Sequence, residues 1–306
     1  MRIHHVVAAA FCASVAFSGS SFAAIISFDP DGAAPGNGAY QVASMDLLVG
    51  NSIAVNAITP NGLSTAFDQL YQARLGSLLD AGGHVINVPG LNAVGGFEIT
   101  AIAGYSATGT VSGSGVGSTV SSHLKIGYDT GFVELFYHPT PSSPHASDLN
   151  GTGFNDDVLI YKGTITAASG VFMITNGTGP LDLFSSAAFW AGNTTVSGIG
   201  GLTLSAATTF YNSAFFTNGT QVLNINANTS TALPYRETDP SKRFINLDGI
   251  TPYTPNIGGA SGTNGITGTD ILIQADANAS FTPEPASLGL LGLGALGLVA
   301  RRRRHD

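Results

Sequence analysis

The densest group of possible metal ligands in the sequence begins at Asp148 and reads Asp-Leu-Asn-Gly-Thr-Gly-Phe-Asn-Asp-Asp. Calcium is held by six to eight oxygen atoms, and a calcium loop supplies them at fixed positions. Positions 1, 3, 5 and 9 of such a loop are occupied here by Asp148, Asn150, Thr152 and Asp156. Position 12, where a bidentate glutamate is expected, is Leu159. Two interpretations remain open, a calcium site and a turn rich in Asx caps.

Two histidines, His138 and His145, flank the proline-rich segment that precedes this group. Imidazole nitrogens are common zinc ligands, but two of them make a site only when the fold brings further ligands alongside. Two interpretations therefore stay open here as well: a zinc site completed by distant residues, and a pair of solvated loop histidines.

Residue types that could support catalysis are sparse. Glu98 and Glu134 are carboxylates of the kind that glycosidases use in pairs, but both lie in apolar stretches that favour solvent-facing strand positions. The body contains no Gly-x-Ser-x-Gly, no His-Glu-x-x-His and no phosphate-binding glycine loop. We therefore predict no enzymatic activity and no catalytic residue. The candidates for stacking on a sugar ring are Trp190, Tyr211, Phe215 and Phe216.

The elements that must position these residues are predicted to be strands. Short apolar runs with period two recur, such as Phe97–Tyr105 and Val158–Thr166, and Gly, Asn, Asp and Pro bound them. Ser169-Gly170 is a predicted turn between two runs. The pattern predicts an all-β fold of antiparallel sheets, either sandwich-like or barrel-like.

The stretch 65–80 fits two kinds of element. Phe67, Tyr71, Leu75 and Leu78 recur at the spacing of one helix face. The first three of these residues also lie on one side of an extended strand. The periodicity alone favours a helix.

Composition excludes one class of partner. The chain has 11 Lys and Arg against 19 Asp and Glu, with a formal net charge of −8. Nucleic-acid binding needs cations that neutralise phosphates, so we expect no nucleic-acid partner. The one cysteine, Cys12, lies in the N-terminal apolar run, which leaves the body without a disulfide or a cysteine metal site.

The N-terminus has the pattern of an export signal. Arg2 precedes the apolar run Val6–Phe17, which is too short to span a bilayer. Small residues follow, and Ala23 and Ala24 flank the expected cleavage point. We predict an N-terminal signal helix and export by the Sec route.

The C-terminal tail has a different pattern. Pro283-Glu284-Pro285 precedes the uncharged run Ala286–Ala300, and Arg301–Arg304 follow at once. As a helix this run measures about 22 Å at 1.5 Å per residue, short of the roughly 30 Å hydrocarbon core. The arginines place that end in the cytoplasm. We therefore expect a short transmembrane helix that anchors the chain transiently.

This tail closely resembles the PEP-CTERM sorting signal, which combines a Pro-Glu-Pro sequence, an apolar segment and an arginine cluster. The matching residues are Pro283, Glu284, Pro285, Arg301, Arg302, Arg303 and Arg304. The resemblance implies recognition by an exosortase, a membrane transpeptidase that cleaves near the Pro-Glu-Pro sequence. It also implies association with exopolysaccharide and biofilm matrix.

Segments of the body resemble the flocculation-associated PEP-CTERM proteins. These segments are Phe28–Gly32, Gly50–Val55, Leu70–Ala73, Gly151–Asp156, Leu233–Tyr235 and Gln274–Asn278. The resemblance implies a secreted matrix protein needed for flocculation, and it carries over no catalytic residue. It also implies a strand over Leu70–Leu75, against the helical periodicity.

The sequence therefore predicts three parts: a signal peptide (1–23), a β-rich extracellular domain (24–282) and a sorting and anchor segment (283–306). We expect an inner-membrane-anchored precursor that becomes a cell-surface or matrix protein and promotes flocculation or biofilm formation without catalysis. Its expected partners are an exosortase, the exopolysaccharide matrix and, transiently, the inner membrane. No cofactor is expected apart from the calcium considered above. The alternatives are a carbohydrate-binding module and a secreted polysaccharide hydrolase.

Overall fold

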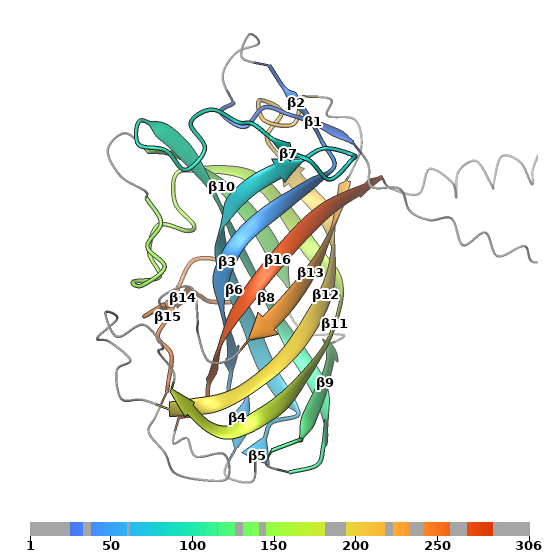
Figure 1. The fold of residues 1–306 in the computed structure, drawn as a ribbon, viewed down its shortest axis with the longest axis vertical. Helices are drawn as coiled ribbons and strands as arrows, with labels where there is room; N and C mark the ends of the chain where they lie inside the picture. Colours follow the sequence, from blue (N-terminus) through green and yellow to red (C-terminus); the bar gives the residue numbers. More distant parts are fainter. Residues whose placement is uncertain are drawn as a thin grey trace, which may run out of the picture.

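The computed structural model describes residues 25–32, 38–59, 62–114, 116–125, 131–140, 145–180, 194–217, 223–232, 241–257 and 268–283. All named elements in these ranges are β-strands. Ten of them form one sheet in the order β10-β8-β9-β11-β12-β13-β16-β3-β6-β7, and the others form three two-stranded sheets. Figure 1 shows the long strands of the large sheet wrapping around a common axis.

The strands of the large sheet are β3 (Ser44–Val55), β6 (Ala66–Leu79), β7 (Val85–Ile86), β8 (Gly96–Ser112), β9 (Thr119–Leu124), β10 (Phe132–Thr140), β11 (Val158–Pro180), β12 (Thr194–Tyr211), β13 (Leu223–Ala232) and β16 (Ile271–Pro283). The three small sheets pair β1 (Ile26–Phe28) with β2 (Tyr40–Val42), β4 (Ile58–Thr59) with β5 (Gly62–Leu63), and β14 (Phe244–Ile245) with β15 (Pro252–Tyr253).

Two further pairings, β10 with β11 and β8 with β6, close the large sheet into a barrel. The strands β9 and β10 share one position in the ring, because both pair with β8 and with β11 at different heights. The described ring therefore has eight positions, and all of its strand pairs are antiparallel. An eight-stranded barrel has an interior that side chains can fill.

The interior is apolar because alternate side chains along each strand point inward. On β6, Ala73 and Leu75 belong to the main core together with Met45 of β3. An aromatic group at the end of the barrel near β1 and β2 extends this core (Figure 1). Its members are Phe28, Phe215, Phe216 and Phe281, with ring centroids of Phe28 and Phe216 5.0 Å apart.

The barrel also encloses an apolar cavity of about 130 Å³. Small side chains account for much of this space, because Ala101, Ala275 and Ala277 are among the residues that line it. Apolar cavities of this order stay dry and cost packing energy.

Filling this cavity should stabilise the protein. We expect Ala277→Val to raise the free energy of unfolding by about 1 kcal/mol, since the added methyl groups occupy apolar space. Urea unfolding measures the change, and Ala66→Val, the same substitution at an exposed position of β6, is the control. A fall in stability for Ala277→Val would show that the wall cannot admit the extra volume.

The outer face of one side of the barrel is covered by two loop segments, 145–157 and 241–257. Phe154 and Ile245 pack on Ile102 of β8, while Phe244 packs on Leu70 of β6. The hydroxyl of Ser241 accepts hydrogen bonds from Asn51 and Gln72, at 2.9 and 2.8 Å, in a buried network. It donates to the backbone carbonyl of Asp148 at 2.7 Å, so both segments are fastened to the wall.

The all-β prediction is confirmed, and the barrel-like alternative is the one observed. Residues 66–79 form strand β6, so the helix favoured by periodicity is wrong. A register shift near Gly76 interrupts the alternation of the strand, so that Leu75 and Leu78 both point inward although they are three residues apart. This spacing imitates that of one helix face. The predicted turn at Ser169-Gly170 is also wrong, because β11 runs through it.

Within the described ranges, no helix has the length and the apolar character needed to cross a membrane. The signal helix expected in residues 1–23 and the membrane helix expected after Pro283 lie outside the described residues. Strand β16 continues to Pro283, so the barrel wall reaches the first residue of the predicted sorting segment.

Candidate metal centre

The site begins on the outer face of two neighbouring strands. In the register of β8 and β10, Glu98 lies directly opposite His138. Both side chains are buried, and Thr100, two residues along β8, is buried beside them. Opposed residues of an antiparallel pair have Cβ atoms about 5 Å apart, so this register places an imidazole next to a carboxylate.

The other members come from the covering segment 145–157. Two glycines bend this segment, Gly151 and Gly153, with φ of +69° and +79°. A Cβ on Gly153 would lie 2.5 Å from the carbonyl oxygen of His145, so this position needs glycine for space as well as for conformation. The resulting path returns the chain over the barrel wall and places His145 and Asp156 near His138.

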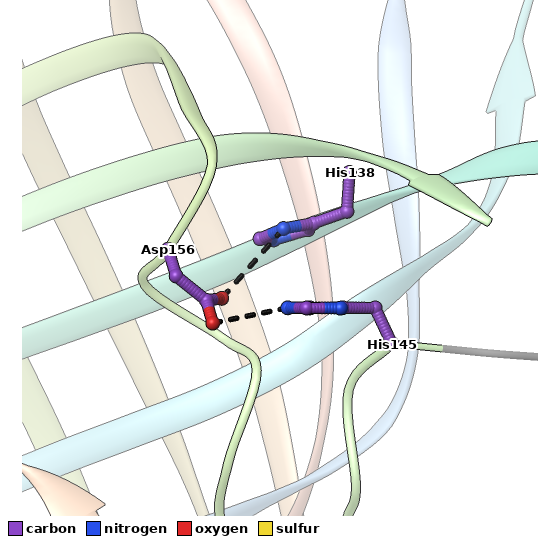
Figure 2. Close-up of side chains that lie close together, drawn as sticks. All are labelled: His138, His145 and Asp156. Atoms are coloured by element: carbon purple, nitrogen blue, oxygen red, sulfur yellow. Dashed lines mark ion pairs between the residues drawn. The ribbon is translucent and has the colours of Figure 1, made fainter. Parts of the chain in front are cut away.

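The three side chains of this centre, His138, His145 and Asp156, face one another (Figure 2). The imidazole rings stack with centroids 4.8 Å apart. The Nε2 atom of His145 lies 3.0 Å from Oδ2 of Asp156, and Nδ1 of His138 lies 3.7 Å from Oδ1 of the same carboxylate. Asp157 approaches from the same side, with Oδ2 3.2 Å from Nδ1 of His138.

Hydrogen bonds determine which nitrogen of His138 carries the proton. The hydroxyl of Thr100 donates its single hydrogen to the carbonyl oxygen of Phe154 at 2.8 Å. Its contact with Nε2 of His138, also 2.8 Å, therefore requires Nε2 to be the donor. In the neutral ring Nδ1 then presents a lone pair, and this lone pair points at the carboxylates of Asp156 and Asp157.

The two histidines have opposite tendencies to hold a proton. Burial lowers the pKa of His138, and the hydrogen bond that its charged form donates to Asp157 only partly offsets this effect. Burial also disfavours the charged form of His145, but the hydrogen bond and charge of Asp156 outweigh it and raise the pKa. Burial thus favours the uncharged form of His138, whereas the carboxylate of Asp156 favours the charged form of His145.

The residues predicted for calcium are divided between different partners. Asp148 forms an ion pair with Arg74 at 2.7 Å, while Asp156 faces the histidines. Thr152 is bonded through its backbone to Ser147, and the backbone nitrogen of Asn150 donates to the hydroxyl of Ser147. Calcium at this segment stays a prediction, but Asp148 and Asp156 do not face each other.

The two glutamates considered for hydrolysis lie apart on the outer face. Glu134 lies opposite Ile102 and pairs with Lys162 at 2.6 Å, whereas Glu98 lies opposite His138. Four residues of strand separate these positions, which is about 13 Å at 3.3 Å per residue. The carboxylates of a glycosidase act together on one bond, whereas here Glu134 is paired with Lys162 and Glu98 lies beside His138.

The aromatic side chains considered for sugar binding have different positions. Phe215 and Phe216 are buried in the core, so the stacking role considered for them is wrong. Trp190 lies outside the described residues, as do Ala23, Ala24, Glu284, Pro285 and Arg301–Arg304.

Sequence reasoning placed His138 and His145 together but missed Asp156 as their partner. It also missed Thr100, Asp157 and Glu98 as neighbours. The Asp156-Asp157 pair directly before the apolar strand at Val158 is the available signal, but the calcium pattern accounts for Asp156 in another way.

A PEP-CTERM protein-sorting motif matches residues 281–304. No curated protein and no solved structure matches the chain. The chain therefore carries the sorting signal of PEP-CTERM proteins. This signal implies an exported, membrane-anchored precursor that an exosortase processes for surface export.

Proposed function

We propose that this chain is a surface protein that is retained in an exopolysaccharide matrix and promotes flocculation or biofilm formation by binding, without catalysis. In this proposal the Sec route exports the chain, a signal peptidase cuts between Ala23 and Ala24, and an exosortase removes the tail near Pro283–Pro285. The resemblance of several body segments to flocculation-associated proteins supports the matrix role.

The observation that carries the proposal is the continuity between the barrel and the sorting motif. The motif begins at Phe281, which is a fully buried core residue of β16. The folded barrel is therefore the part of the chain that the sorting signal delivers, and a surface role must be performed by its outer face and loops.

The outer face of β11 and β12 has the chemistry of a surface that contacts neutral sugars. Thr166, Thr203 and Thr209 are exposed on these two strands, and Phe210, next to Thr209, is 43% exposed. Hydroxyl groups and an aromatic ring suit polar contacts and stacking with sugar rings. Many weak contacts of this kind, repeated along a polymer, add up to strong retention.

Retention in the matrix should depend on polysaccharide and should not depend on salt. We expect the protein to fractionate with the matrix of cells that make exopolysaccharide and to appear in the medium of cells that do not. A wash at about 1 M NaCl should release little of it, because screening at that ionic strength removes charge attraction and leaves neutral contacts.

Quantitative immunoblots of matrix, cell and medium fractions measure this distribution. The variant Phe210→Ala tests the proposed face, with Leu48→Ala, an equally exposed apolar residue on β3, as its control. Equal retention in cells with and without the polysaccharide would contradict the proposal. Release of most of the protein by the salt wash would show that charge, and not neutral contact, holds it.

A further inference from the structure

We propose that His138, His145 and Asp156 bind one zinc ion, which fastens the segment 145–157 to the outer wall of the barrel. The ligand atoms of the three residues all lie within 4.8 Å of one another. Ligands of a tetrahedral zinc with bonds of about 2.05 Å are about 3.4 Å apart. The two oxygen atoms of Asp156 lie on either side of this value, with Oδ2 3.0 Å from Nε2 of His145 and Oδ1 3.7 Å from Nδ1 of His138.

The strongest argument is the orientation of His138. Because Thr100 accepts the Nε2 hydrogen, Nδ1 is the nitrogen that faces the carboxylates of Asp156 and Asp157, at 3.7 and 3.2 Å. A cation placed between Nδ1 and these oxygen atoms would be bound from both sides. Metal-bound histidines commonly donate their other ring hydrogen to a neighbouring acceptor, and Thr100, itself held by the carbonyl oxygen of Phe154, is that acceptor here.

A buried carboxylate beside the three ligands is a second, independent observation. Glu98 is fully buried, and its Oε2 atom has no hydrogen-bond partner in the described part of the chain, while Oε1 accepts from the backbone nitrogen of Ala146. A buried carboxylate with one oxygen left without a hydrogen bond is costly. A divalent cation held by the neighbouring His138 offsets that cost through its charge.

The types of the ligands favour a nitrogen-binding metal such as zinc over calcium and magnesium. Two imidazoles and a carboxylate suit zinc, whereas calcium prefers oxygen ligands only and magnesium keeps most of its water. The side chain of Asp156 is 53% exposed and that of His145 is 35% exposed, so water can occupy a fourth position. The ion joins strand β10 to a loop, because His138 lies on the strand while His145 and Asp156 lie on the covering segment.

The test uses the purified full-length chain after treatment with a chelator. We expect isothermal titration with ZnCl₂ to show one ion bound per chain. The melting temperature should rise by about 5 °C or more at a hundredfold excess over the dissociation constant. CaCl₂ and MgCl₂ at the same concentrations should leave the melting temperature unchanged. With CoCl₂, visible absorption bands report nitrogen and oxygen ligation directly.

Two variants locate the site and a third is the matched control. Asp156→Asn and His145→Gln should each weaken zinc binding at least tenfold and remove most of the zinc-dependent rise in melting temperature. Asp156 is exposed, so its substitution tests the site without threatening the fold. The control is Asp80→Asn, which alters another His–Asp pair, with His84, that has no third ligand among the described residues.

Three results would overturn the proposal. They are the absence of stoichiometric zinc binding, equal zinc binding by Asp156→Asn and the unmodified chain, and equal stabilisation by calcium. The last of these would assign the segment 145–157 to an oxygen-coordinated ion instead. None of these results bears on matrix retention, so failure here is distinguishable from failure of the proposed function.

Discussion

A chain in which Arg301–Arg304 are replaced by four glutamines should fail to be retained and processed at the cell surface. The apolar run that precedes them is shorter than the hydrocarbon core, so it depends on the cations to stop transfer across the membrane and to fix its cytoplasmic end. Without them the anchor is lost, and the exosortase meets little membrane-held precursor. We expect the mature surface form to fall at least tenfold.

The matched control replaces the same four residues by lysine, which keeps the charge and changes only the side-chain geometry. Cell fractionation and the intact mass of the C-terminus measure both variants. If charge is the operative property, the lysine variant is processed and the glutamine variant is not. Normal processing of the glutamine variant would show that recognition depends on Pro283–Pro285 and the apolar run alone.

The fold class followed from the sequence because turn residues and short apolar runs recur along the whole body. The lengths of the strands could not be predicted from the sequence. Ser169 and Gly170 look like a turn, yet β11 continues through them because β9 and β12 pair with it on both sides. Pairing of this kind comes from distant segments, and a local pattern of small residues cannot reveal it.

The error at β6 has a physical cause of the same kind. An exposed barrel strand alternates apolar and polar residues, but β6 has a covered outer face, where Leu70 packs under Phe244. Apolar residues therefore occur on both faces. The register shift near Gly76 also changes which positions point inward. Together these two features give an apolar spacing that resembles one face of a helix. The segment resemblance favoured a strand here, and it was the better guide.

The candidate site could be predicted only in part from the sequence, for the same reason. The spacing of His138 and His145 suggested zinc, but the third ligand depends on how the segment 145–157 returns over the barrel wall. That path is set by the glycine conformations at Gly151 and Gly153 and by the Ser241 network. The oxygen-rich pattern placed Asp148 and Asp156 in one calcium hypothesis. In the structure Asp148 pairs with Arg74, whereas Asp156 faces the two histidines.

Phe281→Ala should destabilise the barrel by roughly 3–5 kcal/mol, as removal of a fully buried phenylalanine typically does. Phe281 is completely buried, and its ring lies 6.4 Å from that of Phe216 in the aromatic group. Asn278→Ala is the control, because this residue is exposed on the same strand and should change stability by less than about 0.5 kcal/mol. Chemical unfolding of both variants measures the difference.

The same residue limits where processing can occur. Strand β16 pairs with β13 as far as Pro283, opposite Leu223, so the wall of the barrel contains the first residues of the sorting motif. A cut before Phe281 would remove a core side chain and several residues of the β13–β16 pairing. We therefore expect the mature C-terminus to lie at or beyond Pro283, as measured by intact mass. A shorter mature chain that is still folded would mean that the barrel closes without the end of β16, and Phe281→Ala would then have little effect on stability.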